Sequence, residues 1–152
     1  MEDSLLAALQ KAKHYCAYQE RCHSEVRDKL YSFGLHRNEV EQLITQLIEE
    51  DFLNEERFAI AYAGGKFRMK QWGKEKIKYG LKQRHVSDYC IKKSLVSIPA
   101  SDYNKTFTSV ADKKLSTLKS EKNIFIKKKK MKDFLQQRGF ELALINDYLK
   151  RV

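Results

Sequence analysis

The chain has 152 residues, of which 42% are hydrophobic and 33% charged, and its formal net charge is +10. This length and apolar content exclude disorder throughout, and they suit one domain or a few small units that share a continuous core. One Pro and six Gly leave few helix breakers and too few turn residues for many short strands. The composition therefore predicts an all-α protein.

Three helices are predicted in the first third of the chain. Residues 4–19 place Leu5, Leu9 and Ala12 on one face at helical intervals. A helical hairpin follows, with a break at Gly34, because glycine suits the left-handed conformation just past a helix end.

The middle third repeats this order. A helix is predicted over residues 54–70, where Asn54 is placed to cap the first turn. The second hairpin breaks at His85, which must tolerate the left-handed conformation or cap differently, and Ser87 is the expected cap of the helix after it. Gly64–Gly65 is expected to mark a bend or close helix packing.

The last third follows the same order again. A helix is predicted over residues 101–119, with Ser101 and Asp102 after Pro99 as its start signal. The third hairpin breaks at Gly139.

Six apolar positions recur with identical spacing in the three hairpins, first 51 and then 54 residues apart. Steps of four, five, five, four and three residues keep one face of each helix turned inward on both sides of the break. Leu81 and Leu95 are therefore expected in the core. The recurring positions are Val26, Leu30, Leu35, Val40, Ile44 and Leu47; Ile77, Leu81, Val86, Ile91, Leu95 and Ile98; and Met131, Leu135, Phe140, Ile145, Leu149 and Val152.

Each hairpin and the helix before it form one three-helix, helix-turn-helix-like repeat, with predicted boundaries at residues 1–50, 51–99 and 100–152. Repeats of this size cannot each bury a full core, so we expect three tandem repeats stacked into an elongated, curved array. No coiled-coil heptads are left exposed, which predicts a monomer.

Charge divides the chain into two unlike parts. Residues 1–65 contain 7 Lys and Arg against 12 Asp and Glu, whereas residues 66–152 contain 23 against 8. The basic part favours a polyanionic partner, most economically nucleic acid, while phosphates would repel the acidic part. The pattern therefore points to a nucleoprotein target.

The sequence also bears on the compartment. It begins without the basic and apolar segments of a secretory signal, and no apolar run approaches membrane-spanning length. Cys16, Cys22 and Cys90 are an odd number scattered through helical patterns, which does not suit a disulfide framework. We expect a cytoplasmic protein with reduced thiols and no membrane contact.

Several runs of residues resemble the RecX family. RCHSEVRDKL at residues 21–30 resembles the opening hairpin of that family, and DFLNEERFA at residues 51–59 is similar to its link between the first and second repeats. Lys66-Phe67-Arg68 and Trp72-Gly73-Lys74, with Ile77 and Leu81, resemble the basic segment of that family's second repeat. The chain departs from the family at Asn54 or Glu55, where aspartate is common, and the third repeat is matched only by its apolar spacing.

This resemblance implies a regulatory protein that binds the RecA filament on single-stranded DNA and mainly inhibits its recombinase and ATPase activity. That role belongs to recombination, DNA repair and the SOS response. The resemblance implies no enzymatic activity and no cofactor.

Two basic segments supply most of the expected contacts. Residues 66–84 form either a surface for phosphates or an acidic groove, or a solvated helix face over core aromatics; Trp72 is expected to be partly exposed. Residues 127–130 contact nucleic acid or form a solvated helix start, and at least one lysine must run close to the core. The candidate RecA or DNA contacts are Arg21, Lys66, Arg68, Lys70, Trp72, Lys74, Lys78, Lys82, Lys127, Lys128, Lys129 and Lys130.

Neither a metal centre nor a catalytic site is expected. His14, Cys16, Cys22 and His23 match no zinc spacing, and Cys16 falls on the apolar face of the first helix. No nucleophile stands at motif spacing from a base, and no glycine-rich loop is built to cradle phosphates.

Two other functions stay open. A helical-repeat protein that binds DNA or RNA directly would show steep salt dependence and no added affinity in the presence of RecA. A nuclease or nucleotide hydrolase built from dispersed carboxylates would turn over its substrate with magnesium, which a turnover assay would detect.

Overall fold

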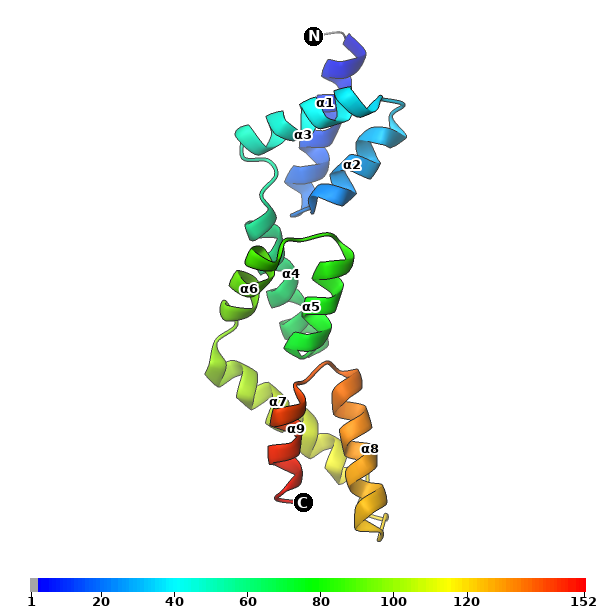
Figure 1. Ribbon diagram of the computed structural model, residues 1–152, viewed down its shortest axis with the longest axis vertical. Coiled ribbons are helices and arrows are strands. Elements are labelled where there is room, and N and C mark those ends of the chain that lie inside the picture. Colours follow the sequence, from blue (N-terminus) through cyan, green and yellow to red (C-terminus); the bar gives the residue numbers. More distant parts are fainter. Residues whose placement is uncertain (1–2) are drawn as a thin grey trace. The chain divides into compact units, whose positions relative to one another are not determined.

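The computed structural model describes residues 3–152, and over this range the chain forms nine α-helices and no strand (Figure 1). The all-α prediction is therefore confirmed. The helices are α1 Asp3–Tyr18, α2 His23–Ser32, α3 Arg37–Glu49, α4 Glu55–Lys70, α5 Lys74–Gln83, α6 Asp88–Val96, α7 Ala100–Ser116, α8 Ile124–Gln137 and α9 Leu142–Leu149.

The chain divides into two compact units. Unit 1 consists of Met1–Ala61 and Leu81–Lys93, and unit 2 consists of Tyr62–Gly80 and Ser94–Val152. The division runs through α4, α5 and α6, so each of these helices contributes residues to both units. The boundaries predicted for the three repeats stay a prediction.

Helices α1, α2 and α3 enclose the core of unit 1. Each contributes one apolar stripe at helical spacing, as the repeat in the sequence requires. Every fully buried leucine there stabilises the fold by roughly 1.5–3 kcal/mol relative to an exposed one. The buried cluster contains Leu5, Ala8, Leu9, Ala12, Cys16, Val26, Leu30, Val40, Leu43, Ile44, Leu47 and Leu53.

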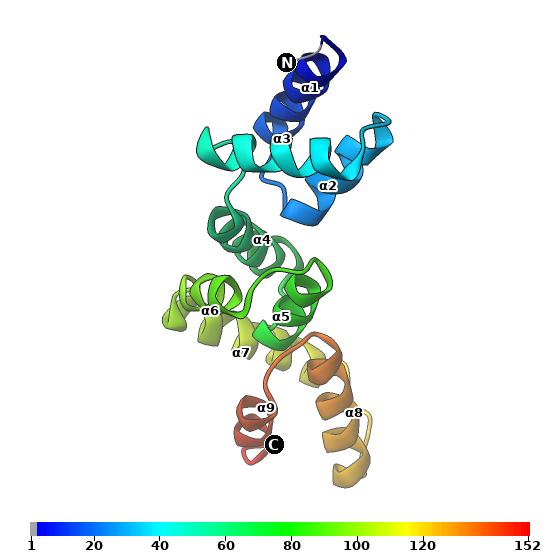
Figure 2. The ribbon, with the colours of Figure 1, turned by 45° about the horizontal axis from the view of Figure 1, so that its top comes forward.

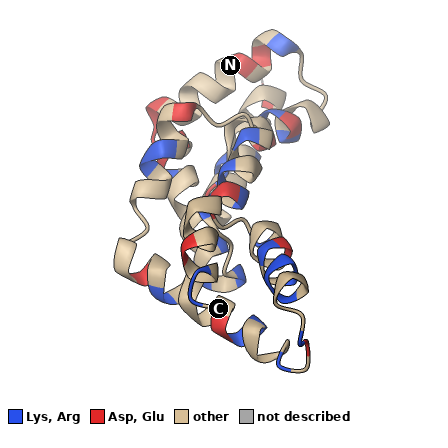
Figure 3. Ribbon diagram, turned by 60° about the horizontal axis from the view of Figure 1, so that its bottom comes forward, with Lys and Arg blue, Asp and Glu red and all other residues tan. Residues whose placement is uncertain are grey.

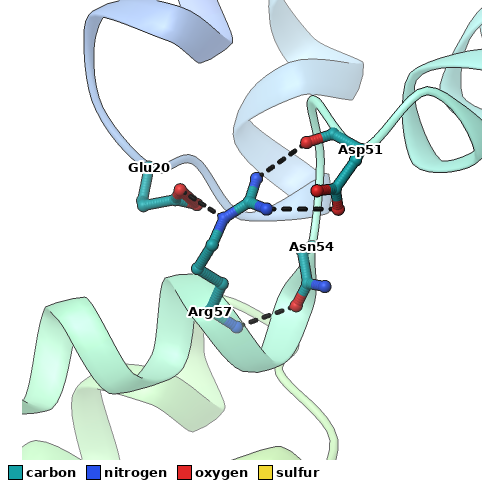
Figure 4. A network of polar contacts seen from close by, with 4 residues as sticks. All are labelled: Glu20, Asp51, Asn54 and Arg57. Atoms are coloured by element: carbon teal, nitrogen blue, oxygen red, sulfur yellow. Dashed lines mark hydrogen bonds and ion pairs between the residues drawn. The ribbon is translucent and has the colours of Figure 1, made fainter.

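Arg57 holds the link between α3 and α4 in place (Figure 4). Its Nε lies 2.5 Å from Glu20 Oε1, and its Nη1 lies 3.2 Å from Asp51 Oδ1. The backbone N–H of Arg57 donates to Asn54 Oδ1 at 2.8 Å, which confirms Asn54 as the cap of α4. Because Glu20 follows α1 and Asp51 follows α3, one guanidinium joins the ends of two helices to the start of a third.

Burial confirms the register of the apolar repeat with one correction. All recurring positions are buried except Leu35, Leu95 and Val152, which are partly exposed. The prediction that Leu95 lies in the core is wrong, because the inward face of α6 continues from Ile91 to Ser94, which has no exposed surface. Leu95 follows Ser94 by one residue and is turned about 100° away from that face.

The three hairpin turns share a left-handed residue: φ is 83° at Gly34, 61° at His85 and 94° at Gly139. In the second and third turns, this residue and the next donate backbone N–H groups to carbonyls of the preceding helix, which is the Schellman ending. His85 thus adopts the conformation that glycine favours. Ser87 caps α6 as predicted, since its Oγ accepts from the Cys90 N–H at 3.3 Å.

The start of α7 differs from the prediction. The helix begins at Ala100, directly after Pro99, and no side chain caps it. The expected capping by Ser101 is wrong, because Ser101 already lies within the first turn, whereas Asp102 is the acidic residue of that turn, as the helix dipole favours. Proline suits the place at which the chain enters a helix, since its missing N–H is not needed there.

Candidate nucleic-acid interface

Charge separates the two units less sharply than it separates residues 1–65 from residues 66–152, which carry −5 and +15. Unit 2 contains 19 Lys and Arg against 7 Asp and Glu, or +12, whereas unit 1 contains 11 against 13, or −2. Figure 3 shows the basic positions in blue and the acidic positions in red. Ten of the twelve predicted contact residues lie in unit 2, and only Arg21 and Lys82 lie in unit 1.

A cluster of two lysines around one tryptophan lies between α4 and α5. Helix α4 ends at Lys70, φ is 56° at the next residue, Gln71, and the Trp72 N–H then donates to the Lys66 carbonyl at 3.3 Å. The ring of Trp72 lies 4.9 Å from Lys66 Nζ and 4.6 Å from Lys76 Nζ, measured to its centroid. Trp72 is half-buried, as predicted. We call Lys66, Trp72 and Lys76 the Trp72 cluster.

The start of α5 packs directly on the turn between α8 and α9 (Figures 1 and 2). The Gly73 N–H donates to the Arg138 carbonyl at 2.7 Å, and the Glu75 N–H donates to the Gly139 carbonyl at 2.9 Å. A Cβ at Gly73 would lie 2.3 Å from the Gly139 carbonyl carbon, and one at Gly139 would lie 2.3 Å from Lys76 Cβ. These glycines allow the close packing that was expected at Gly64–Gly65.

The close helix packing expected as one alternative at Gly64–Gly65 is not found there, whereas the bend stays a prediction. A Cβ at Gly65 would meet nothing within 4 Å, and one at Gly64 would meet only the guanidinium of Arg68 from the same helix. Gly64 is buried and Gly65 half-buried within α4, but the atoms nearest to a Cβ at Gly64 belong to Arg68 of the same helix and not to another helix.

Lys74 belongs partly to the packing of unit 2. Its Nζ lies 4.8 Å from the centroid of the Tyr103 ring, and its backbone N–H donates to Tyr103 Oη at 2.9 Å. The same hydroxyl donates to the carboxylate of Glu141. Burial raises the pKa of Tyr103, and the bond to Glu141 raises this pKa further. Reversing the charge of Lys74 would therefore disturb the fold as well as any ligand contact.

Other basic side chains of this region project more freely. Arg68 and Lys70 are exposed, and Lys78 is half-exposed. Arg138 approaches from the end of α8, with its Nη1 3.4 Å from the Lys70 carbonyl and its Nη2 3.5 Å from Gln71 Oε1. Sequence reasoning missed Arg138, because only tertiary packing brings it to this segment. It counted Lys76 in the basic segment but did not name it as a contact, although Lys76 follows Trp72 by only four residues.

The lysine run occupies the first turns of α8, which Asn123 caps by accepting from the Phe125 N–H at 3.0 Å. Two of its lysines are engaged: Lys129 Nζ lies 3.1 Å from Asp133 Oδ2, and Lys130 Nζ lies 3.6 Å from Glu121 Oε2. The other two, Lys127 and Lys128, are half-buried and form no ion pair within residues 3–152.

The two basic areas are separate. The lysine run stands at the start of α8, and the turn that supports the Trp72 cluster follows the end of the same helix. Seven helical residues, 131–137, separate the run from this turn, which at 1.5 Å per residue is about 10 Å along the helix. Unit 2 therefore offers two distinct basic areas.

An exposed apolar group adjoins the lysine run. Phe125 is 82% exposed, and Ile124 and Ile126 are 41% and 44% exposed. Sequence reasoning missed these residues, because apolar residues at a helix start are usually taken to be core. The sequence signal is a triplet of consecutive apolar residues, which cannot all face inward on a helix.

The two candidates in unit 1 differ in their surroundings. Arg21 Nε donates to the Tyr15 carbonyl at 3.0 Å, and its guanidinium lies 3.8 Å from the centroid of the Tyr15 ring. Only 13% of the Arg21 side chain is exposed, so it is largely engaged within the unit. Lys82 is exposed.

Cys16, Cys22 and Cys90 are all buried and unpaired. Over the described part of the chain, no group of three or more His, Cys, Asp or Glu side chains is arranged to hold a metal ion. In the same range, no helix is both long enough and apolar enough to cross a membrane.

Proteins similar to this chain are regulatory proteins named RecX. One from Clostridium perfringens (strain 13 / Type A) is 29% identical over 152 residues, which cover 99% of this chain and 71% of that protein. One from Clostridium botulinum (strain Eklund 17B / Type B) is 32% identical over 127 residues, covering 83% and 59%. One from Chlorobaculum tepidum is 29% identical over 146 residues, covering 96% and 88%.

Solved structures have the same fold. The crystal structure of RecX from Lactobacillus salivarius matches with a TM-score of 0.88 at 24% identity, over 99% of this chain and 97% of that one. A second crystal structure of regulatory protein RecX matches with a TM-score of 0.86 at 18% identity, over 99% and 73%.

Family models match in three consecutive segments. Residues 8–47 match the first three-helix domain of RecX, residues 54–95 the second and residues 102–149 the third. Together these matches cover far more than half of the sequence, in the order in which the domains occur. The chain therefore belongs to the RecX family.

Proposed function

We propose that this chain is a non-catalytic, monomeric regulator that binds the RecA filament on single-stranded DNA in the cytoplasm and mainly inhibits its recombinase and ATPase activity. The observation that carries the proposal is the match to all three RecX domains over residues 8–149. Relatives that align with nearly the whole chain are named regulatory proteins.

The division of charge supports a contact with both components of the filament. Unit 2, at +12, is suited to DNA phosphates, and unit 1, at −2, would be repelled by them and is suited to protein. A protein bound in this way would occupy surface that RecA needs for filament growth, ATP turnover and strand exchange.

Direct binding to DNA or RNA without RecA is the second candidate. The basic side chains that no carboxylate neutralises, such as Lys127 and Lys128, favour it, since they are available to phosphates. The two candidates differ in one measurable respect: only the regulator gains affinity when RecA coats the DNA.

The test measures RecA's DNA-dependent ATPase with and without a substoichiometric amount of this protein, together with filament length. We expect a lower ATPase rate, shorter filaments, and tighter binding to RecA-coated than to bare single-stranded DNA. Unchanged rate and filament length would rule out the proposal, and equal affinity for coated and bare DNA would favour the second candidate.

A pair of variants connects the function to unit 2. Neutralising two exposed residues, Arg68→Gln with Lys70→Gln, should weaken binding to the coated DNA without lowering stability. The matched control is Arg37→Gln with Lys92→Gln, which removes the same charge from exposed positions of unit 1. Equal effects of the two pairs would show that only net charge matters.

A further inference from the structure

Trp72 holds two lysines from different helices against one ring. Each ammonium nitrogen of Lys66 and Lys76 lies within 5 Å of the ring centroid, so the two nitrogens lie within 10 Å of each other. Over residues 3–152, neither lysine forms an ion pair with a carboxylate. Two uncompensated cations therefore share one aromatic side chain.

The backbone fixes both lysines. Lys66 is tied to Trp72 by the hydrogen bond from the Trp72 N–H to the Lys66 carbonyl. Lys76 is held by the contact of its Cβ and backbone with Gly139, in which even one added carbon would clash. Because both backbones are held, the side chains have fewer arrangements to lose when a ligand binds.

We propose that Trp72 is a positioning residue that aligns Lys66 and Lys76 as a clamp for two phosphates of a single-stranded nucleic-acid backbone. The inference rests on the proposed function, since it names part of the contact that the regulator makes with DNA. The negative face of the ring attracts each ammonium group and so holds it in place. The N–H donors of that ammonium group that do not point at the ring stay available to a phosphate.

The clamp differs from a base-stacking site. An aromatic ring that stacks on a base must expose its face, whereas the ring of Trp72 is half-buried and lies in cation–π contact with two lysines. The clamp therefore recognises phosphates and not bases. It should bind any flexible chain of phosphates, with or without bases.

The first experiment uses the fluorescence of Trp72, which is the only tryptophan in the chain. The full protein is titrated, without RecA, with a dT oligonucleotide and in parallel with inorganic polyphosphate. We expect a saturable change with both, because phosphates draw the ammonium groups away from the ring. A change with the oligonucleotide alone would indicate base stacking and overturn the clamp, as would no change with either.

The second experiment measures the affinity of variants for a fluorescently labelled dT oligonucleotide by anisotropy. Trp72→Leu, which removes the ring, should lower affinity about fivefold, whereas Trp72→Phe, which keeps an aromatic face, should stay within about twofold of the wild type. Lys66→Gln with Lys76→Gln should reduce the slope of log affinity against log salt by about 1.4.

Combining the variants separates positioning from packing. Trp72→Leu should have no further effect in the Lys66→Gln, Lys76→Gln background, and a persisting loss would overturn the proposal. The matched control, Lys105→Gln with Lys122→Gln, removes two exposed charges elsewhere in unit 2 and should weaken binding less. If Trp72→Leu lowers thermal stability, the result for the lysine pair decides instead, because Lys→Gln keeps most of the methylene stem of these two half-buried side chains.

Failure of the clamp and failure of the proposed function are distinguishable. The titrations contain no RecA, and inhibition of the RecA ATPase is measured separately for the same variants. Unchanged oligonucleotide binding by the lysine pair overturns the clamp even when RecA is inhibited normally. Absence of RecA inhibition by the wild type overturns the proposed function, whatever the titrations show.

Discussion

Tyr103 connects two repeats through one hydroxyl group. This hydroxyl accepts from the Lys74 N–H at 2.9 Å and donates to the carboxylate of Glu141. Tyr103 is buried, and its ring packs against Phe67 and Phe140 at centroid distances of 5.8 Å. The first amide of α5, which no helical carbonyl can satisfy, thus finds its partner 29 residues away.

Replacing Tyr103 by Phe tests this bond through stability and its pH dependence. At neutral pH the loss of both bonds should cost about 1–3 kcal/mol, because the Lys74 N–H is left unsatisfied. Burial raises the folded-state pKa of Tyr103, so its stabilising contribution is complete below pH ~10. That contribution declines as the pH rises above this value, because the unfolded chain then ionises first.

Urea unfolding between neutral pH and the alkaline range measures both effects. The wild type should lose stability above pH ~10 more steeply than Tyr103→Phe, which has no hydroxyl to ionise. Tyr89→Phe removes the hydroxyl of a tyrosine that is 63% exposed, so it should match the wild type. Parallel alkaline profiles for the wild type and Tyr103→Phe would contradict the role given to this hydroxyl.

For individual residues, the chemical kind of the site could be predicted from the sequence, but the contacts of its side chains could not. The basic segment and the partial exposure of Trp72 follow from local pattern, because charge and helix boundaries can be read locally. The partners of Lys74 and Lys76 do not, since Tyr103 and Gly139 are distant in the chain. Contacts between distant segments decide which lysines are engaged in the fold and which are available to a ligand. Such contacts cannot be read from the pattern of a single sequence.

Among the helices and turns, the hairpin turn is the structural feature that recurs in all three repeats. Gly34, His85 and Gly139 all adopt positive φ at the same place in the three hairpins. Their surroundings differ, since a Cβ at Gly34 would meet nothing within 4 Å, whereas one at Gly139 would clash with Lys76. The same turn is therefore free in the first hairpin and packed in the third.

Two alanine substitutions should separate backbone strain from packing. Gly34→Ala should cost only the left-handed strain, about 1–2 kcal/mol. Gly139→Ala carries the same strain and in addition places its Cβ 2.3 Å from Lys76 Cβ, so it should be clearly more destabilising. Chemical denaturation of both variants measures the difference. Equal losses would mean that the turn and α5 move apart without cost.

Much of the arrangement of elements was predictable. The helices expected over residues 4–19, 54–70 and 101–119 are Asp3–Tyr18, Glu55–Lys70 and Ala100–Ser116. Apolar spacing is sufficient for this, because period and breaks are local properties. The inward position of Ser94 was missed, since a small polar residue gives no apolar signal.

At the scale of the whole molecule, the two compact units cut across the threefold repeat. The sequence predicted repeats because apolar spacing reports local helix pairs, but the extent of a unit depends on contacts between distant segments. Tyr62–Gly80 belongs with Ser94–Val152, and the contacts of Gly73 and Tyr103 explain why. The uneven charge of the chain follows the sequence more closely than the units, since residues 1–65 and 66–152 carry −5 and +15 whereas the units carry −2 and +12.

This division of charge predicts where the salt dependence of DNA binding originates. Lys127→Gln with Lys128→Gln and Arg37→Gln with Lys92→Gln lower the net charge equally, the first pair in unit 2 and the second in unit 1. If phosphates contact unit 2, the first pair should reduce the slope of log affinity against log salt by about 1.4. The second pair should leave the slope unchanged, because charges that contact no phosphate release no counterions when DNA binds.

Titration of a labelled dT oligonucleotide across salt concentrations, without RecA, measures both slopes. Equal reductions would show that the total charge attracts DNA without regard to position, and the assignment of DNA to unit 2 would then be wrong. A reduction confined to Lys127→Gln with Lys128→Gln would place phosphates at the start of α8. Because these lysines lie about 15 Å along α8 from the turn that supports the Trp72 cluster, their contribution should add to that of Lys66 and Lys76.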